Sequence, residues 1–171
     1  MNESPLVSIL MNCYNGEKYL QEAINSILNQ TYKNWELVFW DNQSTDKSAE
    51  IFLSNKDPRL FYYFSPTHTK LGDARILATN KIKGDWIAII DTDDLWEPNK
   101  LTKQIYAITN TKTSSETVGL VYCKAMVIDK NSVIKKELCH KDFLDSSMPE
   151  GRILQDLLLK GNFIISPSIL I

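Results

Sequence analysis

The sequence predicts an α/β fold, in which a mostly parallel, twisted sheet is flanked by helices. Short apolar strand patterns alternate with amphipathic helix patterns along the first 110 residues. The segment Trp86–Ile90 is apolar throughout, as expected for a parallel strand that is covered on both faces. The length of 171 residues is enough for one domain with a substantial core.

The first part of the chain contains four strand patterns, each followed by a helix pattern. Apolar and β-branched runs predict strands at Leu6–Met11, Trp35–Trp40, Leu60–Phe64 and Trp86–Ile90. Apolar spacings of three and four residues predict helices at Glu17–Gln30, from the polar loop 41–46 to Leu53, at Leu71–Ile82, and from Pro98 onward. Asn15 is the expected N-cap of the first helix.

The second part of the chain is less regular. It predicts a polar loop at Thr109–Thr117, a strand at Val118–Ile128, a short strand near Val133, a helix at Arg152–Lys160 and a strand at Phe163–Ile171. An apolar strand at the end of a domain invites pairing with other chains. We therefore expect residues 1–171 to form a single domain that is truncated at its C-terminus.

Composition excludes several classes of protein. The net charge is −2 and no dense run of Lys and Arg occurs, so nucleic acid is not an expected partner. Three cysteines without a CxxC pair indicate neither a disulfide framework nor a zinc site. No apolar run approaches the ~20 residues of a transmembrane helix. A cytoplasmic location is expected, with peripheral membrane association as a further option.

Polar residues gather where three of the expected strands end, at 12–16, 41–46 and 91–94. Ligands of open α/β sheets bind outside the carboxyl ends of the strands, so these loops form one cleft if their strands are neighbours. In an extended backbone Asp91 and Asp93 point to the same side, and two carboxylates suit Mg²⁺ or Mn²⁺. A DxD pattern alone is more often a solvated loop that caps a helix. Its position after a buried strand, beside two other polar loops, favours a metal that holds a diphosphate.

The chain resembles the nucleotide-binding part of the family 2 glycosyltransferases, which are inverting enzymes with a GT-A fold. The resemblance runs from about Val7 to Leu101 and continues more weakly to Ile171. It is carried by VSILMNCYNGEKYLQEAINSILNQTYKNWELVFWDNQSTD and by GDARILATNKIKGDWIAIIDTDDLWEPNKL. These two segments in this order are far more specific than DxD alone.

The resemblance implies a nucleotide site. Asn12 and Tyr14 would line the base pocket, with the Tyr14 ring against the base, since stacking on an aromatic face tolerates any base. The family has an Asp at the second position of the loop after the second strand, where this chain has Asp41 followed by Asn42. Uridine is the expected base. Either residue is a candidate to contact it, and the alternative for Asp41 is that it only caps the loop.

The resemblance also assigns the phosphate end of this site. Arg75 stands where the family keeps a basic residue that faces the nucleotide, although an Arg on a solvated helix face would be equally ordinary. Asp91 would contact the ribose or the metal, and Asp93 would bind the metal. Trp96 either packs under the loop, which is the favoured reading, or flanks the sugar. No role is assigned to His68 or to His140.

The implied reaction transfers a sugar, with inversion, from a nucleotide-diphosphate sugar to an acceptor hydroxyl. A UDP-sugar is the expected donor, and a glycan or glycolipid of cell-surface polysaccharide biosynthesis the expected acceptor. The family's general base follows the strand represented by Phe163–Ile171, so the catalytic residue is unknown and lies beyond Ile171. The chain would then hold the donor site and turn over poorly by itself.

Two alternatives remain open. IIDTDDL is similar to the strand-end motif of haloacid-dehalogenase phosphatases, although Leu95 stands where Thr or Val is expected. The chain could also be a non-catalytic module that binds a nucleotide sugar. A sugar nucleotidyltransferase and a dinucleotide-binding dehydrogenase are disfavoured because the chain has no Gly-rich phosphate loop after its first strand.

Overall fold

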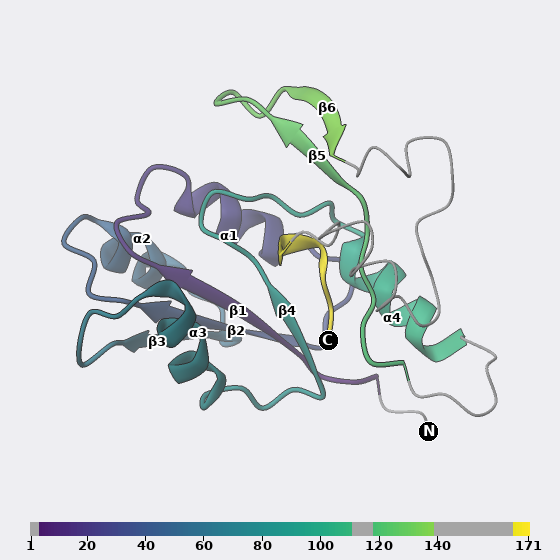
Figure 1. Ribbon diagram of the computed structural model, residues 1–171, viewed down its shortest axis with the longest axis horizontal. Helices are drawn as coiled ribbons and strands as arrows, with labels where there is room; N and C mark the ends of the chain where they lie inside the picture. The colour runs from purple at the N-terminus through teal and green to yellow at the C-terminus, as the bar shows by residue number, and fades with distance from the viewer. Residues whose placement is uncertain (1–3, 111–117, 139–165) are drawn as a thin grey trace, which may run out of the picture.

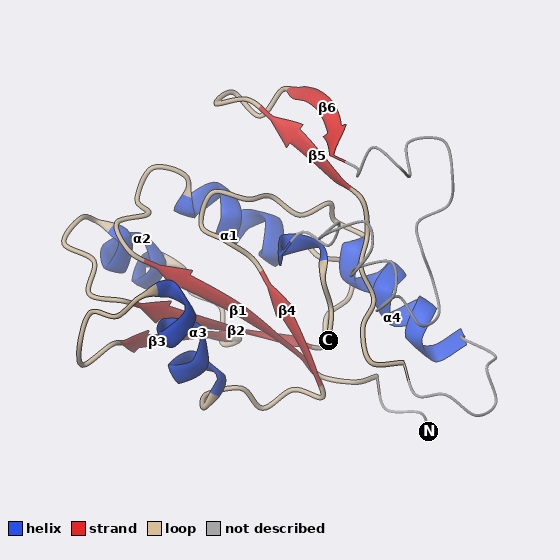
Figure 2. Ribbon diagram, in the orientation of Figure 1, coloured by secondary structure: helices blue, strands red, loops and turns tan. Residues whose placement is uncertain are grey.

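Four parallel strands form the central sheet of the computed structural model, which describes residues 4–110, 118–138 and 166–171 (Figures 1 and 2). The strands are β1 (Val7–Cys13), β2 (Trp35–Asp41), β3 (Leu60–Phe64) and β4 (Trp86–Ile89), in the order β3-β2-β1-β4. The strands β2, β1 and β4 are therefore neighbours, which is the condition that the predicted cleft required.

Helices cover both faces of this sheet. They are α1 (Leu20–Leu28), α2 (Ser48–Ser54), α3 (Leu71–Thr79) and α4 (Lys100–Asn110). Because side chains alternate along a strand, Ile9 and Met11 pack in a core with residues of α1, α2 and α4, whereas Leu10 packs against Ala74 and Ala78 of α3. The predicted α/β fold with a mostly parallel sheet is confirmed. No helix within the described residues is long and apolar enough to span a membrane.

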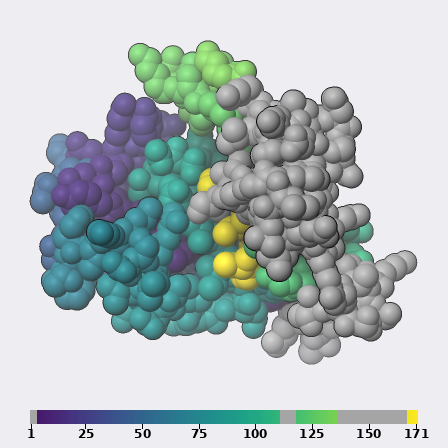
Figure 3. Space-filling model, viewed as in Figure 1, coloured from purple at the N-terminus to yellow at the C-terminus, as the bar shows by residue number. Residues whose placement is uncertain are grey.

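A separate antiparallel pair, β5 (Ala125–Ile128) and β6 (Ile134–Leu138), stands out from the main body (Figure 3). The short strand expected near Val133 corresponds to β6. The strand expected at Val118–Ile128 is wrong in extent, because only its last four residues pair with β6. Of the remainder, Val121 makes a single bridge to Leu170.

The strand expected at Phe163–Ile171 is also wrong where the structure describes it. Ser166–Ser168 forms a short 3₁₀ helix, since Pro167 has no N–H to donate and its φ is fixed. Leu170 is fully buried and bridges Ala88, and Ile171 exchanges two backbone hydrogen bonds with Ile87. These last residues run along the outer edge of β4. The expected helix at 152–160 lies outside the described residues.

Asn15 does not cap the first helix. The helix α1 begins at Leu20, and the residue before it makes no side-chain cap. Asn15 instead adopts a positive φ of 55°, a conformation that Asn tolerates. Its Oδ1 accepts a hydrogen bond from the backbone N–H of Thr45 at 2.8 Å. The side chain thus joins the loop after β1 to the loop after β2.

Candidate functional site

The loops after β1 and β2 are bound together by several hydrogen bonds. The backbone N–H of Asn42 donates to the carbonyl of Cys13 at 2.8 Å, which extends the strand pairing by one step. The N–H of Gly16 donates to Ser48 Oγ at 3.0 Å. These contacts hold the polar ends of two neighbouring strands side by side, as the sequence predicted.

Gly16 brings the loop after β1 against the acidic loop after β4. A Cβ at Gly16 would lie 2.8 Å from Thr92 Oγ1 and 3.0 Å from Thr92 Cβ, closer than side chains normally approach. Glycine is therefore required for this contact. Thr92 lies between Asp91 and Asp93, so the packing fixes the acidic loop relative to the first loop. All three predicted polar segments meet at one edge of the sheet.

The acidic loop is a turn, and the extended backbone assumed for Asp91 and Asp93 is wrong. The N–H of Asp94 donates to the carbonyl of Asp91 at 3.2 Å, which closes a four-residue turn. Burial, together with the charges of Asp91 and Asp93, raises the pKa of Asp94 to about 6. The three carboxylates are thus close enough to repel one another, and the side chain of Asp93 is exposed.

The carboxylate oxygens of the acidic loop fit a hard divalent cation. Mg²⁺ is commonly held by one or two carboxylates, with water or phosphate oxygens completing its coordination. A cation would also relieve the repulsion that raises the pKa of Asp94. The described part of the chain contains no group of three or more His, Cys, Asp or Glu side chains arranged to enclose a metal by themselves.

Arg75 pairs with Asp91, so two of the predicted site residues are in direct contact. Arg75 Nη2 donates to Asp91 Oδ1 at 2.8 Å, and both side chains are partly buried. Arg75 is therefore not a solvated residue of α3. Its Nε is buried and has no hydrogen-bond partner among the described residues. The guanidinium places a positive charge beside the acidic loop.

A cavity of about 260 Å³ lies at the carboxyl ends of β1 and β2 and is also lined by Leu71 and Ala74 of α3. Tyr14 lines it and is 55% exposed, which leaves a ring face accessible to a flat ligand. The Tyr14 ring centroid lies 4.3 Å from that of His68. Asn12 also lines the cavity, and both polar atoms of its amide are buried without a partner in the described structure.

Asp41 and Asn42 are both engaged within the protein. Asn42 Nδ2 donates to the carbonyl of Thr69 at 2.7 Å, and its Oδ1 accepts from the Thr69 N–H at 3.2 Å. A carboxylate could not make the first of these bonds, which accounts for an amide at this position. Asp41 is fully buried and accepts from the Tyr62 hydroxyl and from the Ser44 N–H, each at 2.7 Å. Burial and the nearby Asp41 raise the pKa of Tyr62.

Sequence reasoning missed the segment after β3. His68, Thr69 and Lys70 line the same cavity as Tyr14, and His68 Nδ1 lies 2.9 Å from the carbonyl of Asn42. The available signal was that the third parallel strand ends at the same edge of the sheet as the others. Trp96 follows the favoured expectation: it is 6% exposed, and its Nε1 donates to the carbonyl of Pro167 at 3.0 Å.

The family comparison covers nearly the whole chain. A sequence profile described as Glycosyl transferase family 2 matches residues 8–168. The UDP-Glc:alpha-D-GlcNAc-diphosphoundecaprenol beta-1,3-glucosyltransferase of Escherichia coli is 34% identical over 131 residues, which cover 77% of this chain and 50% of that protein. The chain spans about half the length of the curated relatives it matches.

Two solved structures have a similar fold. The S. aureus protein TarS in complex with UDP-GlcNAc has a TM-score of 0.62 and 20% identity, over 96% of this chain and 44% of that chain. The mannosyltransferase PcManGT of Pyrobaculum calidifontis in complex with GDP-Man and Mn²⁺ has a TM-score of 0.62 and 23% identity, over 75% of this chain and 37% of that chain. The expected GT-A fold is confirmed, and the phosphatase and non-catalytic alternatives are not favoured.

Proposed function

Because the chain belongs to glycosyl transferase family 2, we propose that it forms the donor-binding domain of an enzyme that transfers a sugar, with inversion, to an acceptor hydroxyl. The observation that carries the proposal is the meeting of an aromatic-lined cavity and an acidic loop at one sheet edge. Gly16 and Thr92 join the two by packing. Arg75 of α3 binds Asp91 of the acidic loop at 2.8 Å.

The cavity beside Tyr14 takes the base of the donor. The exposed ring of Tyr14 offers a stacking face, and the unpaired amide of Asn12 offers one donor and one acceptor to a base edge. Asn42 shapes this cavity through Thr69, which binds both polar atoms of its amide. A uridine nucleotide is the proposed ligand. Two similar proteins support this choice: the E. coli relative is named for UDP-Glc, and the TarS structure contains UDP-GlcNAc.

Asp91 and Asp93 hold Mg²⁺ or Mn²⁺ in this proposal. The bound metal supplies a positive charge that stabilises the departing diphosphate, as a Lewis acid. Arg75 holds one oxygen of Asp91 and leaves the other without a hydrogen-bond partner in the described structure. The PcManGT complex contains Mn²⁺ together with a nucleotide sugar, which supports a divalent cation in a protein of this fold.

The acceptor is proposed to be a glycan or glycolipid of cell-surface polysaccharide biosynthesis. The E. coli relative is named for an acceptor sugar that is linked to a lipid through a diphosphate. No described residue is assigned as the general base that takes the acceptor's proton. We place that base beyond Ile171, and we place the domain in the cytoplasm, where peripheral association with a membrane would reach a lipid-linked acceptor.

Calorimetric titration of UDP, GDP and dTDP into the chain tests the proposal. With Mn²⁺ present, UDP binding is expected, and Asp93→Ala is expected to weaken it about tenfold or more. Asp85→Ala is the matched control, because Asp85 lies at the opposite end of β4, where its carboxylate accepts from the Leu6 N–H. Absence of binding by all three nucleotides, or equal loss in both variants, would contradict the donor-site proposal.

A further inference from the structure

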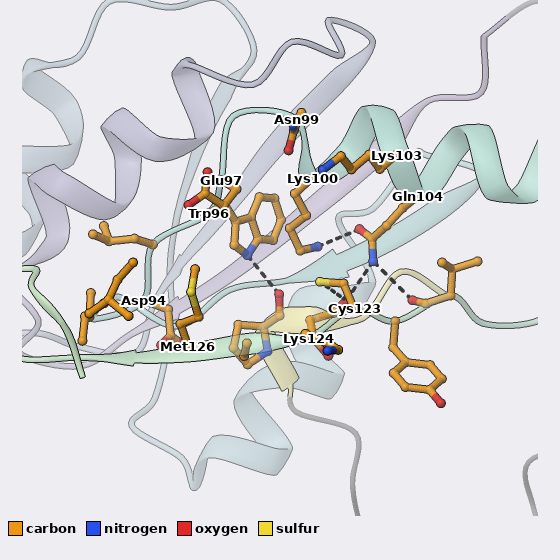
Figure 4. A pocket seen from close by; sticks show the side chains of 18 of the residues that line it. Asp94, Trp96, Glu97, Asn99, Lys100, Lys103, Gln104, Cys123, Lys124 and Met126 are labelled. Carbon is orange, nitrogen blue, oxygen red and sulfur yellow. Dashed lines mark hydrogen bonds between the residues drawn. The ribbon is translucent and has the colours of Figure 1, made fainter. Parts of the chain in front are cut away.

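A second and larger cavity, of about 650 Å³, lies next to the acidic loop (Figure 4). It is enclosed by α4, by the segment 121–126 and by Pro167 and Ser168, and Asp94 borders it. Cavities of this size hold small ligands in other proteins. None of the residues proposed to bind the base or the metal lines it, so the donor site does not account for it.

A buried ammonium group faces this cavity. Lys100 is the first residue of α4 and is 7% exposed. Its Nζ donates to Gln104 Oε1 at 2.8 Å and lies 4.0 Å from the ring centroid of Trp96. Figure 4 shows the side chains of Lys100, Gln104 and Cys123 directed toward one another. Within the described ranges no carboxylate forms an ion pair with Lys100.

The groups around Lys100 are held in place by backbone contacts. Gln104 Nε2 donates to the carbonyl of Ser168 at 2.8 Å, and Trp96 Nε1 donates to the carbonyl of Pro167 at 3.0 Å. The ammonium has three N–H groups, and Gln104 Oε1 is the one hydrogen-bond acceptor it has among the described residues. The cavity therefore presents a positioned cation with hydrogen-bonding capacity to spare.

A buried charge without a counter-ion is costly. Burial lowers the pKa of Lys100 to about 8, so the group is still mainly protonated at neutral pH. The other charged and titratable groups that line the cavity are Lys103, Lys124, Tyr122, Cys123, Asp94 and Glu97. Both carboxylates belong to the acidic-loop side, and neither pairs with Lys100. An anion that enters the cavity would offset the cost of burying the ammonium.

We propose that this cavity binds a phosphate group of the acceptor, with Lys100 as its charged partner. The binding of phosphate follows from the cavity and the buried ammonium alone, whereas its assignment to the acceptor rests on the proposed function. The donor's diphosphate would lie with Asp91 and Asp93. A second phosphate-binding cavity, bordered by Asp94 of the same loop, suits an acceptor that is linked through a phosphate.

Phosphate binding is tested on the chain in EDTA, without nucleotide, so that the proposed metal site takes no part. The probes are inorganic phosphate and geranyl diphosphate, and the readout is the indole N–H signal of Trp96 in an NMR spectrum, assigned with Trp96→Phe. Both probes are expected to move this signal. Lys100→Met is expected to weaken binding about tenfold or more, whereas Lys100→Arg retains it.

Controls separate a local effect from misfolding. Lys56→Met removes an exposed lysine in the loop that follows α2, and this variant is expected to bind phosphate as the wild type does. Thermal unfolding verifies that each variant is folded, and Lys100→Gln replaces Lys100→Met if the latter is not. The proposal is overturned if the Trp96 signal stays fixed up to about 10 mM phosphate. It is also overturned if Lys100→Met or Lys100→Gln is folded and binds phosphate as tightly as the wild type.

The two diphosphates distinguish the source of the phosphate. Geranyl diphosphate that binds more tightly than metal-free UDP, with the same dependence on Lys100, supports an acceptor phosphate. UDP that moves the Trp96 signal at lower concentration than geranyl diphosphate overturns the acceptor assignment. Failure of the proposed function has a different signature, in which phosphate binds through Lys100 but no nucleotide binds with Mn²⁺.

Discussion

Replacement of Lys100 by methionine is expected to stabilise the chain at neutral pH. The wild-type ammonium is buried beside Trp96 and Gln104 without an ionic partner among the described residues. Burial lowers its pKa from 10.5 to about 8. The unfolded chain therefore binds this proton more tightly than the folded chain. Protonation favours unfolding fully below pH 8 or so, and the effect is lost as the pH rises toward 10.5.

The size of the effect follows from the shift in pKa. A fall from 10.5 to about 8 corresponds to about 3 kcal/mol at pH 7, since each unit is worth about 1.4 kcal/mol. At pH 10 the folded lysine is neutral, and the destabilisation that comes from protonation of the unfolded chain is only about 1 kcal/mol. Loss of the hydrogen bond to Gln104 subtracts about 1 kcal/mol at every pH. Lys100→Met should thus be more stable by about 2 kcal/mol at pH 7, and the gain should disappear near pH 10.

The difference in the free energy of unfolding between the wild type and Lys100→Met can be measured by urea unfolding. The measurement is made at several pH values between 7 and 10, in buffer without phosphate. Comparison of the two proteins at each pH cancels the titration of all other groups. Lys56→Met, at an exposed position, should show no pH-dependent gap. A difference between wild type and Lys100→Met that is constant from pH 7 to pH 10 would refute the reasoning.

Three further substitutions probe the site. Gly16→Ala places a Cβ 2.8 Å from Thr92 Oγ1 and should lower the free energy of unfolding by about 1 to 3 kcal/mol, measured in urea, and should also weaken Mn²⁺-dependent UDP binding. Asn12→Leu removes a buried unpaired amide and should stabilise the free chain by about 1 kcal/mol, while calorimetry shows weaker UDP binding. Asp94→Asn removes a carboxyl group whose pKa is raised to about 6. Its unfolding temperature should exceed that of the wild type above pH 6, and the gap should close as the pH falls below about 4, because the wild-type group is then protonated in both states.

The sheet could be predicted because its pattern is local. Each parallel strand is a short apolar run, and the alternation of Ile9 and Leu10 between two helical layers needs only the two-residue repeat of a strand. The polar residues after β1, β2 and β4 could be placed together because parallel strands end at the same edge. Their contacts through Gly16 and Thr92 depend on packing that no spacing reveals.

The predictions that failed depend on contacts between distant segments. Asn15 is of a residue type that commonly caps helices, yet its side chain binds Thr45, thirty residues away. The contacts of Asn42 have no local pattern either, because Thr69, 27 residues away, binds both polar atoms of its amide. No local sequence pattern distinguishes His68. It reaches Tyr14 only because β3, β2 and β1 are adjacent and end at the same edge of the sheet. Such pairings are specified by the tertiary structure.

The central claim is that the acidic loop holds a divalent cation beside a bound nucleotide diphosphate. Crystals soaked with Mn²⁺ and UDP, measured at the manganese absorption edge, test it most directly. We expect an anomalous peak in contact with Asp91 and Asp93, with the diphosphate on the metal and the base against Tyr14. A nucleotide bound elsewhere, or a peak distant from both aspartates, would contradict it.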